Sequence, residues 1–241
     1  MINKESVNKA RSLYYGLLSK MFVFTTDKSR YSGVLEVLDV LIENPMDEAS
    51  HEALKEIKEF FSTYGEEALS QEYDDVFHNP AYSVVRNTAS YYDEGVESGH
   101  MRLAMINFLA KTRIRKNEHS FKENEDSFGF IFTFMHELIE LIMAGNKEYD
   151  NLHHCIFAEV INGIIDEFII AVYEHKMAKA YRFVAVVLNS FVAFERLYFE
   201  VSKPSLKEKK TAQKPVERIS QAEAKRRAEN KAQKARAKEL S

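Results

Sequence analysis

Apolar residues recur every three or four positions through most of this 241-residue chain, and this spacing is the period of an α-helix. The clearest example covers residues 128–142. The other helices that we expect cover residues 13–22, 34–41, 54–61, 66–77, 101–109, 157–172 and 181–198. No stretch alternates between apolar and polar residues for long enough to indicate a strand. The sequence therefore predicts an all-α fold with a single helical-bundle domain.

Breaks in the helical pattern divide the chain into segments. Gly65 is a natural stop between the third and fourth expected helices. The pattern then fails over residues 78–99, where Pro80 disfavours a helical conformation at the residue before it. This stretch carries several aromatic side chains, so we expect an ordered mid-chain loop. Asn124 or Asp126 can cap the start of the clearest helix.

The charges are distributed unevenly along the chain, although the net charge is only −4. Residues 203–241 hold 13 Lys and Arg against 5 Asp and Glu, whereas residues 1–202 hold 20 against 32. We therefore expect an acidic helical domain over 1–202 and a basic, disordered or marginally helical tail over 203–241. An acidic domain attracts basic ligands and repels nucleic acid.

Cys155 is the one cysteine of the chain, so no internal disulfide can form and a reducing compartment is indicated. The first residues are polar and do not resemble a signal peptide. No apolar run approaches the roughly 20 residues needed to span a bilayer. We therefore expect a cytoplasmic protein without a membrane span.

Motifs for metal binding or catalysis are weak. Glu48-x-x-His51 and Glu97-x-x-His100 match one element of di-iron bundles, but both lie in polar surroundings near helix starts, so we expect no metal. We interpret His153 and His154 as surface histidines beside a buried cysteine. No nucleophile elbow or glycine-rich phosphate loop is present. The sequence thus predicts a protein that is not an enzyme and needs no cofactor.

An acidic and aromatic stretch is the strongest functional signal. Glu72, Asp74 and Asp75 lie at the C-terminal end of their expected helix, where negative charge is unfavourable. Tyr73 and Phe77 alternate with them, and further tyrosines follow after Pro80. Carboxylates pair with arginine and aromatic rings bury apolar groups. This pattern favours a binding site for a basic, partly apolar peptide.

Four motifs in this order resemble the TorD/DmsD family of chaperones for molybdenum enzymes, over roughly residues 13–196. Residues 15–22 (Tyr-Gly-Leu-Leu-Ser-Lys-Met-Phe) are similar to the first-helix motif of that family. Residues 72–77 (Glu-Tyr-Asp-Asp-Val-Phe) with Pro80, and residues 89–91 (Ala-Ser-Tyr), are similar to its central motifs. Asp126 matches the Asp of a family Asp-His pair, in which Ser127 replaces the His, and Phe134-Met135 follows.

The resemblance implies a cytoplasmic chaperone that binds a twin-arginine signal peptide, the apo form of a molybdenum oxidoreductase, or both, and assists cofactor insertion before export. Formate dehydrogenase and dimethyl-sulfoxide or trimethylamine-oxide reductase types are possible clients, and nitrate reductase types also remain open. The residues that match family positions in the implied peptide site are Tyr73, Phe77, Pro80, Ser90, Tyr91, Asp126 and Ser127. To these we add Glu72, Asp74 and Asp75, which together with Asp126 would pair with the arginines of the ligand.

An alternative hypothesis is a helical adaptor that contacts nucleic acid or the ribosome through its basic tail. The tail has no aromatic residues interleaved with its charges, so specific nucleic-acid recognition is not expected. The oligomeric state is open between a monomer and a domain-swapped dimer, because a bundle with a long mid-chain loop can exchange halves.

Overall fold

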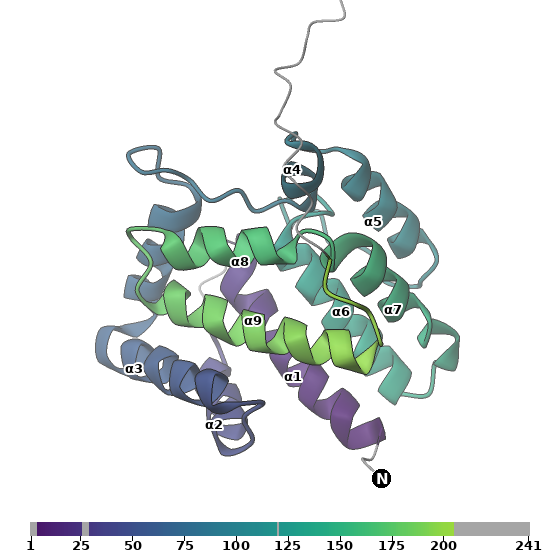
Figure 1. The fold of residues 1–241 in the computed structure, drawn as a ribbon, viewed down its shortest axis with the longest axis horizontal. Helices are drawn as coiled ribbons and strands as arrows, with labels where there is room; N and C mark the ends of the chain where they lie inside the picture. Colours follow the sequence, from purple (N-terminus) through teal and green to yellow (C-terminus); the bar gives the residue numbers. More distant parts are fainter. Residues whose placement is uncertain (1–3, 26–28, 120, 205–241) are drawn as a thin grey trace, which may run out of the picture. The chain divides into compact units, whose positions relative to one another are not determined.

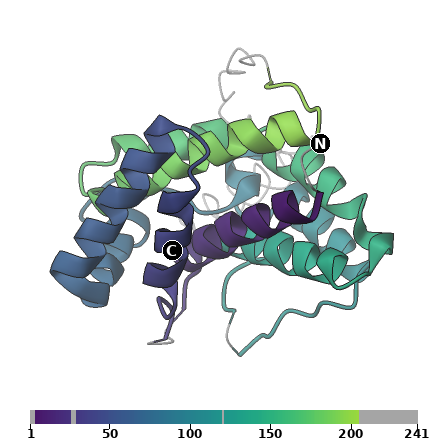
Figure 2. The same cartoon turned by 90° about the horizontal axis from the view of Figure 1, so that it is seen from below.

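The central helix of the fold is α1 (Lys4–Phe22), which buries a nearly continuous apolar face. The computed structural model describes residues 4–25, 29–119 and 121–204. Figure 1 shows α1 behind α9 (Ala180–Tyr198), and Figure 2 shows α2 (Val34–Glu43) and α3 (Glu48–Phe77) on one side of α1. The other side of α1 packs against α6 (Phe128–Met143). The described residues contain helices and no strand, so the predicted all-α class is confirmed for them.

The remaining elements cover this centre. They are α4 (Ala89–Glu94), α5 (His100–Ala110), a 3-10 turn at Lys147–Tyr149, α7 (Leu152–Ile156), a π-helical turn at Phe157–Ile161, and α8 (Ile165–Glu174). Helix α8 packs along α9, and α3 packs against the opposite flank of α9. Among the described residues, no helix is both long enough and apolar enough to span a bilayer.

Helices α1 and α9 run antiparallel. At one end of the pair, the Tyr181 hydroxyl donates to the Met21 carbonyl at 2.5 Å. At the other end, the Arg11 guanidinium binds the Glu195 carboxylate through two hydrogen bonds of 2.6 and 2.9 Å. These contacts place the C-terminal end of α1 beside the start of α9, and its N-terminal end beside the end of α9.

The backbone at two positions, Gly65 and Gly129, requires glycine for a clear structural reason. Gly65 has φ 79° and ψ 178°, which kinks α3 between its two halves and confirms the predicted break. Gly129 lies where α6 starts against the end of α1. A Cβ at Gly129 would be 2.5 Å from the Val23 Cα, so a larger residue would push the two helices apart.

The structure corrects three local predictions. The expected loop over 78–99 contains the short helix α4. The expected helix over 157–172 is interrupted after the π-helical turn, because the Asn162 side chain accepts from Arg196 and donates to the Ser202 carbonyl. The cap of α6 is Ser127, whose hydroxyl accepts from the Phe130 N–H, and not Asn124 or Asp126.

The interpretation of residues 153–155 was also wrong. His153 is only 3% exposed, whereas His154 and Cys155 are half-buried. The basic tail predicted from residue 203 lies outside the described residues, apart from Lys203 and Pro204.

Candidate functional site

The C-terminal end of α3 presents acidic, imidazole and apolar groups to solvent. We call this the α3-end surface; it consists of Asp74, Asp75, His78, Pro80 and Tyr82. The Asp75 carboxylate is half-buried and accepts from the side-chain amides of Asn79 at 2.8 Å and Gln71 at 3.3 Å. The exposed Asp74 carboxylate lies 3.4 Å from Nδ1 of His78. Within the described part of the chain, neither carboxylate is paired with a lysine or arginine.

One acid in the turn after α4 is already paired within the chain. Glu97 accepts from the Thr88 hydroxyl at 2.6 Å and lies 3.8 Å from the Arg86 guanidinium. The same guanidinium covers the half-exposed ring of Tyr91, with 5.7 Å between Cζ and the ring centroid. The surface around α4 therefore offers an aromatic ring, and two further acids, Asp93 and Glu94, pair there with the His100 imidazole and not with a lysine or arginine of the described residues.

A buried contact fixes α4 to the start of α6. One oxygen of the Asp126 carboxylate accepts from the N–H of Ser90 at 3.1 Å and from its hydroxyl at 2.5 Å. Two backbone hydrogen bonds flank this contact, from Ala89 to the Asp126 carbonyl and from Phe128 to the Asn87 carbonyl. Ser90, Asp126 and the α6 cap Ser127 are all at most 1% exposed. None of these three can meet a ligand without local opening.

Glu72 is also internal, although we predicted it as a partner for the arginines of a ligand. Its carboxylate accepts from the backbone N–H groups of Lys179, Ala180 and Tyr181 at 2.6 to 3.2 Å, which caps the start of α9. Burial raises the pKa of Glu72, and these three donors act in the opposite direction. A carboxylate is stabilised at a helix N-terminus. This contact therefore holds the end of α3 against the start of α9.

Tyr73 and Phe77 belong to the aromatic core. Their ring centroids are 4.9 Å apart, and both rings lie near Tyr181. The Arg30 guanidinium lies over the Tyr73 ring at 4.2 Å and donates to the carbonyls of Lys20 and Met21 at the end of α1. The face of Tyr73 that a ligand's arginine would use is therefore already covered.

Phe168 of α8 links the two exposed regions through the core. Its ring lies 6.4 Å from that of Phe77 and 5.8 Å from that of Tyr92, and it stacks on Phe128 at 3.9 Å. The α3-end surface and the α4 surface thus rest on one aromatic cluster.

Sequence reasoning missed the role of Glu123. Its carboxylate accepts from the Phe24 N–H and from the Asn87 side-chain amide, each at 2.9 Å, and burial raises its pKa. The Phe24 ring in turn packs on His78 at 4.9 Å. Glu123 therefore holds the chain after α1 against the α3-end surface. No spacing in the sequence marks this contact, because its partners lie at least 36 residues away.

The two Glu-x-x-His pairs do not form a joint metal site among the described residues. His51 lies with Glu48 and Glu52 on α3, whereas His100 lies with Asp93 and Glu94 between α4 and α5. Glu97 is not part of the second group and binds Thr88. A di-iron centre needs both pairs to face one interior, which this arrangement does not provide.

Comparison with known proteins places this chain within a family. The family model described as nitrate reductase delta subunit matches residues 43–169, which include the α3-end surface, α4 and the Ser90–Asp126 contact. One crystal structure, of a candidate redox enzyme maturation protein from Archaeoglobus fulgidus, aligns with 18% sequence identity and a TM-score of 0.48. That alignment covers 77% of this chain and 93% of the other. The comparison with curated proteins found no match.

Proposed function

The chain belongs to the nitrate reductase delta subunit family, of the TorD/DmsD chaperone type, and we propose that it is a cytoplasmic maturation chaperone for a molybdenum-containing oxidoreductase. In this proposal it binds the twin-arginine signal peptide of its client, the client's apo form, or both, and assists cofactor insertion before export. It acts by binding and is not an enzyme. The acidic domain over residues 1–202 carries this function, and the tail over 203–241 is a separate segment.

The observation that carries the proposal is the uncompensated charge of Asp74 and Asp75. Both lie in the last turn of a long helix, where the macrodipole makes negative charge unfavourable. The groups around them are amides and an imidazole, and Pro80 and Tyr82 add apolar surface beside them. These neighbours leave the two carboxylates without a lysine or arginine among the described residues, and a partner's guanidinium groups would supply the missing positive charge in bidentate pairs.

The other predicted site residues take different roles in this proposal. Pro80 and Tyr91 are exposed and offer direct contacts. Glu72, Tyr73, Phe77, Ser90, Asp126 and Ser127 are buried and act by holding α3, α4, α6 and α9 in place. We therefore assign pairing with the ligand's arginines to Asp74 and Asp75, and a positioning role to Glu72 and Asp126.

The client is a molybdenum oxidoreductase of the formate dehydrogenase, dimethyl-sulfoxide or trimethylamine-oxide reductase, or nitrate reductase type. The test therefore uses peptides from several client types.

Calorimetric titration of the full chain with twin-arginine signal peptides tests the proposal. Each peptide is paired with a version in which two lysines replace the arginines, and each pair is measured at two salt concentrations. We expect saturable binding that weakens with Lys-Lys, with added salt, and in Asp74→Asn and Asp75→Asn. Glu59→Gln removes one exposed charge from the first half of the same helix and should leave binding unchanged. Equal loss in Glu59→Gln, or no preference for arginine, would contradict the proposed site.

A further inference from the structure

Hydrogen bonds hold the backbone of Asn79 in the turn that follows α3. Its N–H donates to the Asp74 carbonyl at 2.8 Å, and its own carbonyl accepts from the Tyr82 N–H at 3.1 Å. Pro80 further restricts the backbone of the residue before it. The direction in which the Asn79 side chain leaves the backbone is therefore set by this turn.

The side-chain amide of Asn79 joins the turn to Asp75. Its Oδ1 accepts from the Ala81 N–H at 3.0 Å, and its Nδ2 donates to Oδ1 of Asp75 at 2.8 Å. A backbone N–H only donates and an ionised carboxylate only accepts, so one orientation of the amide satisfies both contacts. The Ala81 contact is usual for asparagine in a turn, whereas the Asp75 contact goes beyond what the turn needs.

Asp75 is held through only one of its two oxygens. Its Oδ1 accepts from Asn79 and, at 3.3 Å, from Nε2 of Gln71, so both acceptor positions of this oxygen are used. Its Oδ2 is accessible to solvent and accepts no hydrogen bond from the described residues. The carboxylate is thus oriented from within the chain and leaves one oxygen open to a ligand.

Asp74 lacks such orientation. Its exposed carboxylate lies 3.4 Å from Nδ1 of His78, which is longer than an ordinary hydrogen bond between these atoms. A guanidinium has five N–H donors. One of them can bind Oδ2 of Asp75 while others bind Asp74, so Asp75 sets the direction of the ligand and Asp74 adjusts to it.

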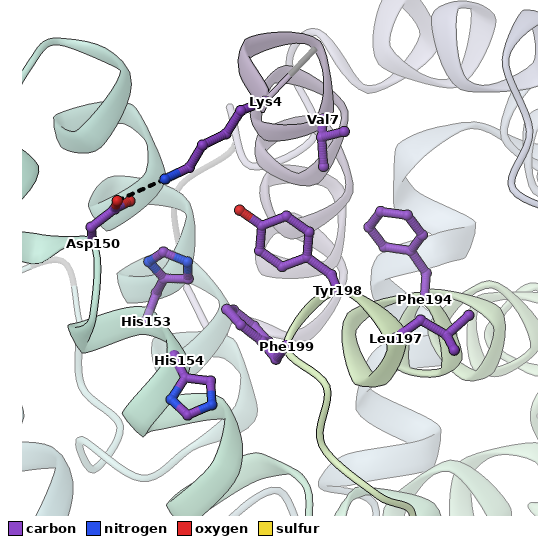
Figure 3. A pocket seen from close by; sticks show the side chains of 9 residues that line it. All are labelled: Lys4, Val7, Asp150, His153, His154, Phe194, Leu197, Tyr198 and Phe199. Carbon is purple, nitrogen blue, oxygen red and sulfur yellow. Dashed lines mark hydrogen bonds and ion pairs between the residues drawn. The ribbon is translucent and has the colours of Figure 1, made fainter. Parts of the chain in front are cut away.

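A comparison with Asp150 shows what is particular to Asp75. Asp150 lines a pocket of about 580 Å³ beside the first turn of α1, where Lys4 binds its carboxylate at 2.7 Å (Figure 3). The chain itself thus supplies the opposite charge at Asp150. At Asp75 it supplies two neutral amides, which direct the carboxylate but leave its charge for a partner.

We propose that Asn79 is a positioning residue for the arginines of the ligand and acts through Asp75. The inference rests on the proposed function, from which it takes the twin-arginine ligand and the α3-end surface. Each side chain that has to be immobilised on binding lowers the affinity. Because Asn79 orients Asp75 before the ligand arrives, it raises the affinity without touching the ligand.

A purely structural Asn79 would have different consequences. It would close the turn and offset the negative charge of Asp75 at the end of a helix. Losing it would loosen the end of α3 and so affect Asp74 and Asp75 together. A positioning role concerns Asp75 alone, because the Asn79 amide contacts that carboxylate and not the carboxylate of Asp74.

Double-mutant cycles with the full chain separate the two roles. The change is Asn79→Ser, because a serine hydroxyl can still accept from the Ala81 N–H but is too short to reach Asp75. It is made in the wild type, in Asp75→Asn and in Asp74→Asn. Calorimetric titration measures the affinity of each protein for twin-arginine signal peptides, at low salt so that the variants with one carboxylate still bind measurably.

We expect Asn79→Ser to weaken binding about three- to ten-fold in the wild type and in Asp74→Asn, and to have no effect in Asp75→Asn. Unchanged affinity in the wild type, or equal weakening in the two carboxylate variants, would overturn the positioning role and leave the proposed function standing. If no twin-arginine peptide binds the wild type, the proposed function fails and this inference fails with it.

Discussion

The Asp126 carboxylate binds both the backbone N–H and the hydroxyl of Ser90, which lies 36 residues earlier in the chain. The other carboxylate oxygen, Oδ1, is buried without a partner. A single side chain thus joins the start of α4 to the start of α6 and completes only half of its own hydrogen bonding. Such a contact stabilises the fold through its charged hydrogen bonds. Losing it leaves a buried carboxylate with too few donors, which lowers the free energy of unfolding.

Ser90→Ala should lower the free energy of unfolding by about 1–3 kcal/mol, because it removes a hydroxyl donor from a buried carboxylate and keeps the N–H. Urea denaturation followed by far-UV circular dichroism measures the change. Ser62→Ala alters an exposed serine on α3 and serves as the matched control, with little effect expected. Equal midpoints for the two variants would show that the Ser90 hydroxyl contributes nothing to stability.

Glu123 gives a pH dependence of stability with a definite sign. Burial raises its pKa above the ordinary value of 4.5, although the Phe24 N–H and the Asn87 amide favour the charged form. The folded state therefore holds this proton more tightly than the unfolded state. The resulting stabilisation is complete below the unfolded pKa and is lost as the pH rises through the folded pKa.

The difference in unfolding free energy between the wild type and Glu123→Gln should consequently fall as the pH rises from about 4 to about 7. Urea titrations of both proteins at several pH values measure it. Because the difference is taken between two proteins that share every other titrating group, it reports Glu123 itself. A difference that grows with pH would mean that the donors around Glu123 outweigh its burial.

The helical class was predictable because periodicity depends only on local spacing, and the kink at Gly65 followed from a conformation that glycine adopts readily. The helix α4 was not predictable in this way. It has six residues, too few for a period to show, and its start is held by Asp126 from a distant part of the chain. The break after residue 161 depends likewise on Arg196 and Ser202.

The candidate site was predictable in composition but not in exposure. Glu72 and Asp74 are two residues apart in one helix, yet Glu72 caps α9 and Asp74 faces solvent. Which carboxylate is buried depends on where α9 begins. The spacing of residues within α3 gives no information about the position of α9. For the same reason the buried state of His153 was missed, since Arg11 and Tyr198 cover it from other helices.

The pair of Arg11 and Glu195 should be costly to break, because both side chains are 0% exposed and Tyr15 donates to the same carboxylate. We expect Glu195→Gln to lower the free energy of unfolding by about 3–5 kcal/mol, since it leaves the guanidinium buried without a counter-charge. Replacing both partners, as in Arg11→Met with Glu195→Leu, should recover part of this loss. Urea denaturation of the three variants measures both effects.

A matched control for that pair is Glu52→Gln, which breaks the exposed contact with Lys55 on α3 and should change stability little. If Glu195→Gln were as mild as Glu52→Gln, water would have to reach the Arg11 guanidinium.

Asp74→Asn should have opposite effects on stability and on binding. The residue lies in the last turn of α3, where removing a negative charge relieves an unfavourable interaction with the helix macrodipole. We expect the free energy of unfolding to rise by about 0.3–1 kcal/mol, reduced by whatever the neighbouring His78 contributes. Binding of a twin-arginine peptide should weaken in the same variant. Urea denaturation and calorimetric titration of one preparation measure both quantities. A variant that lost stability and kept its affinity would show that Asp74 serves the fold, whereas gain of stability with loss of affinity is the pattern of a residue retained for its partner.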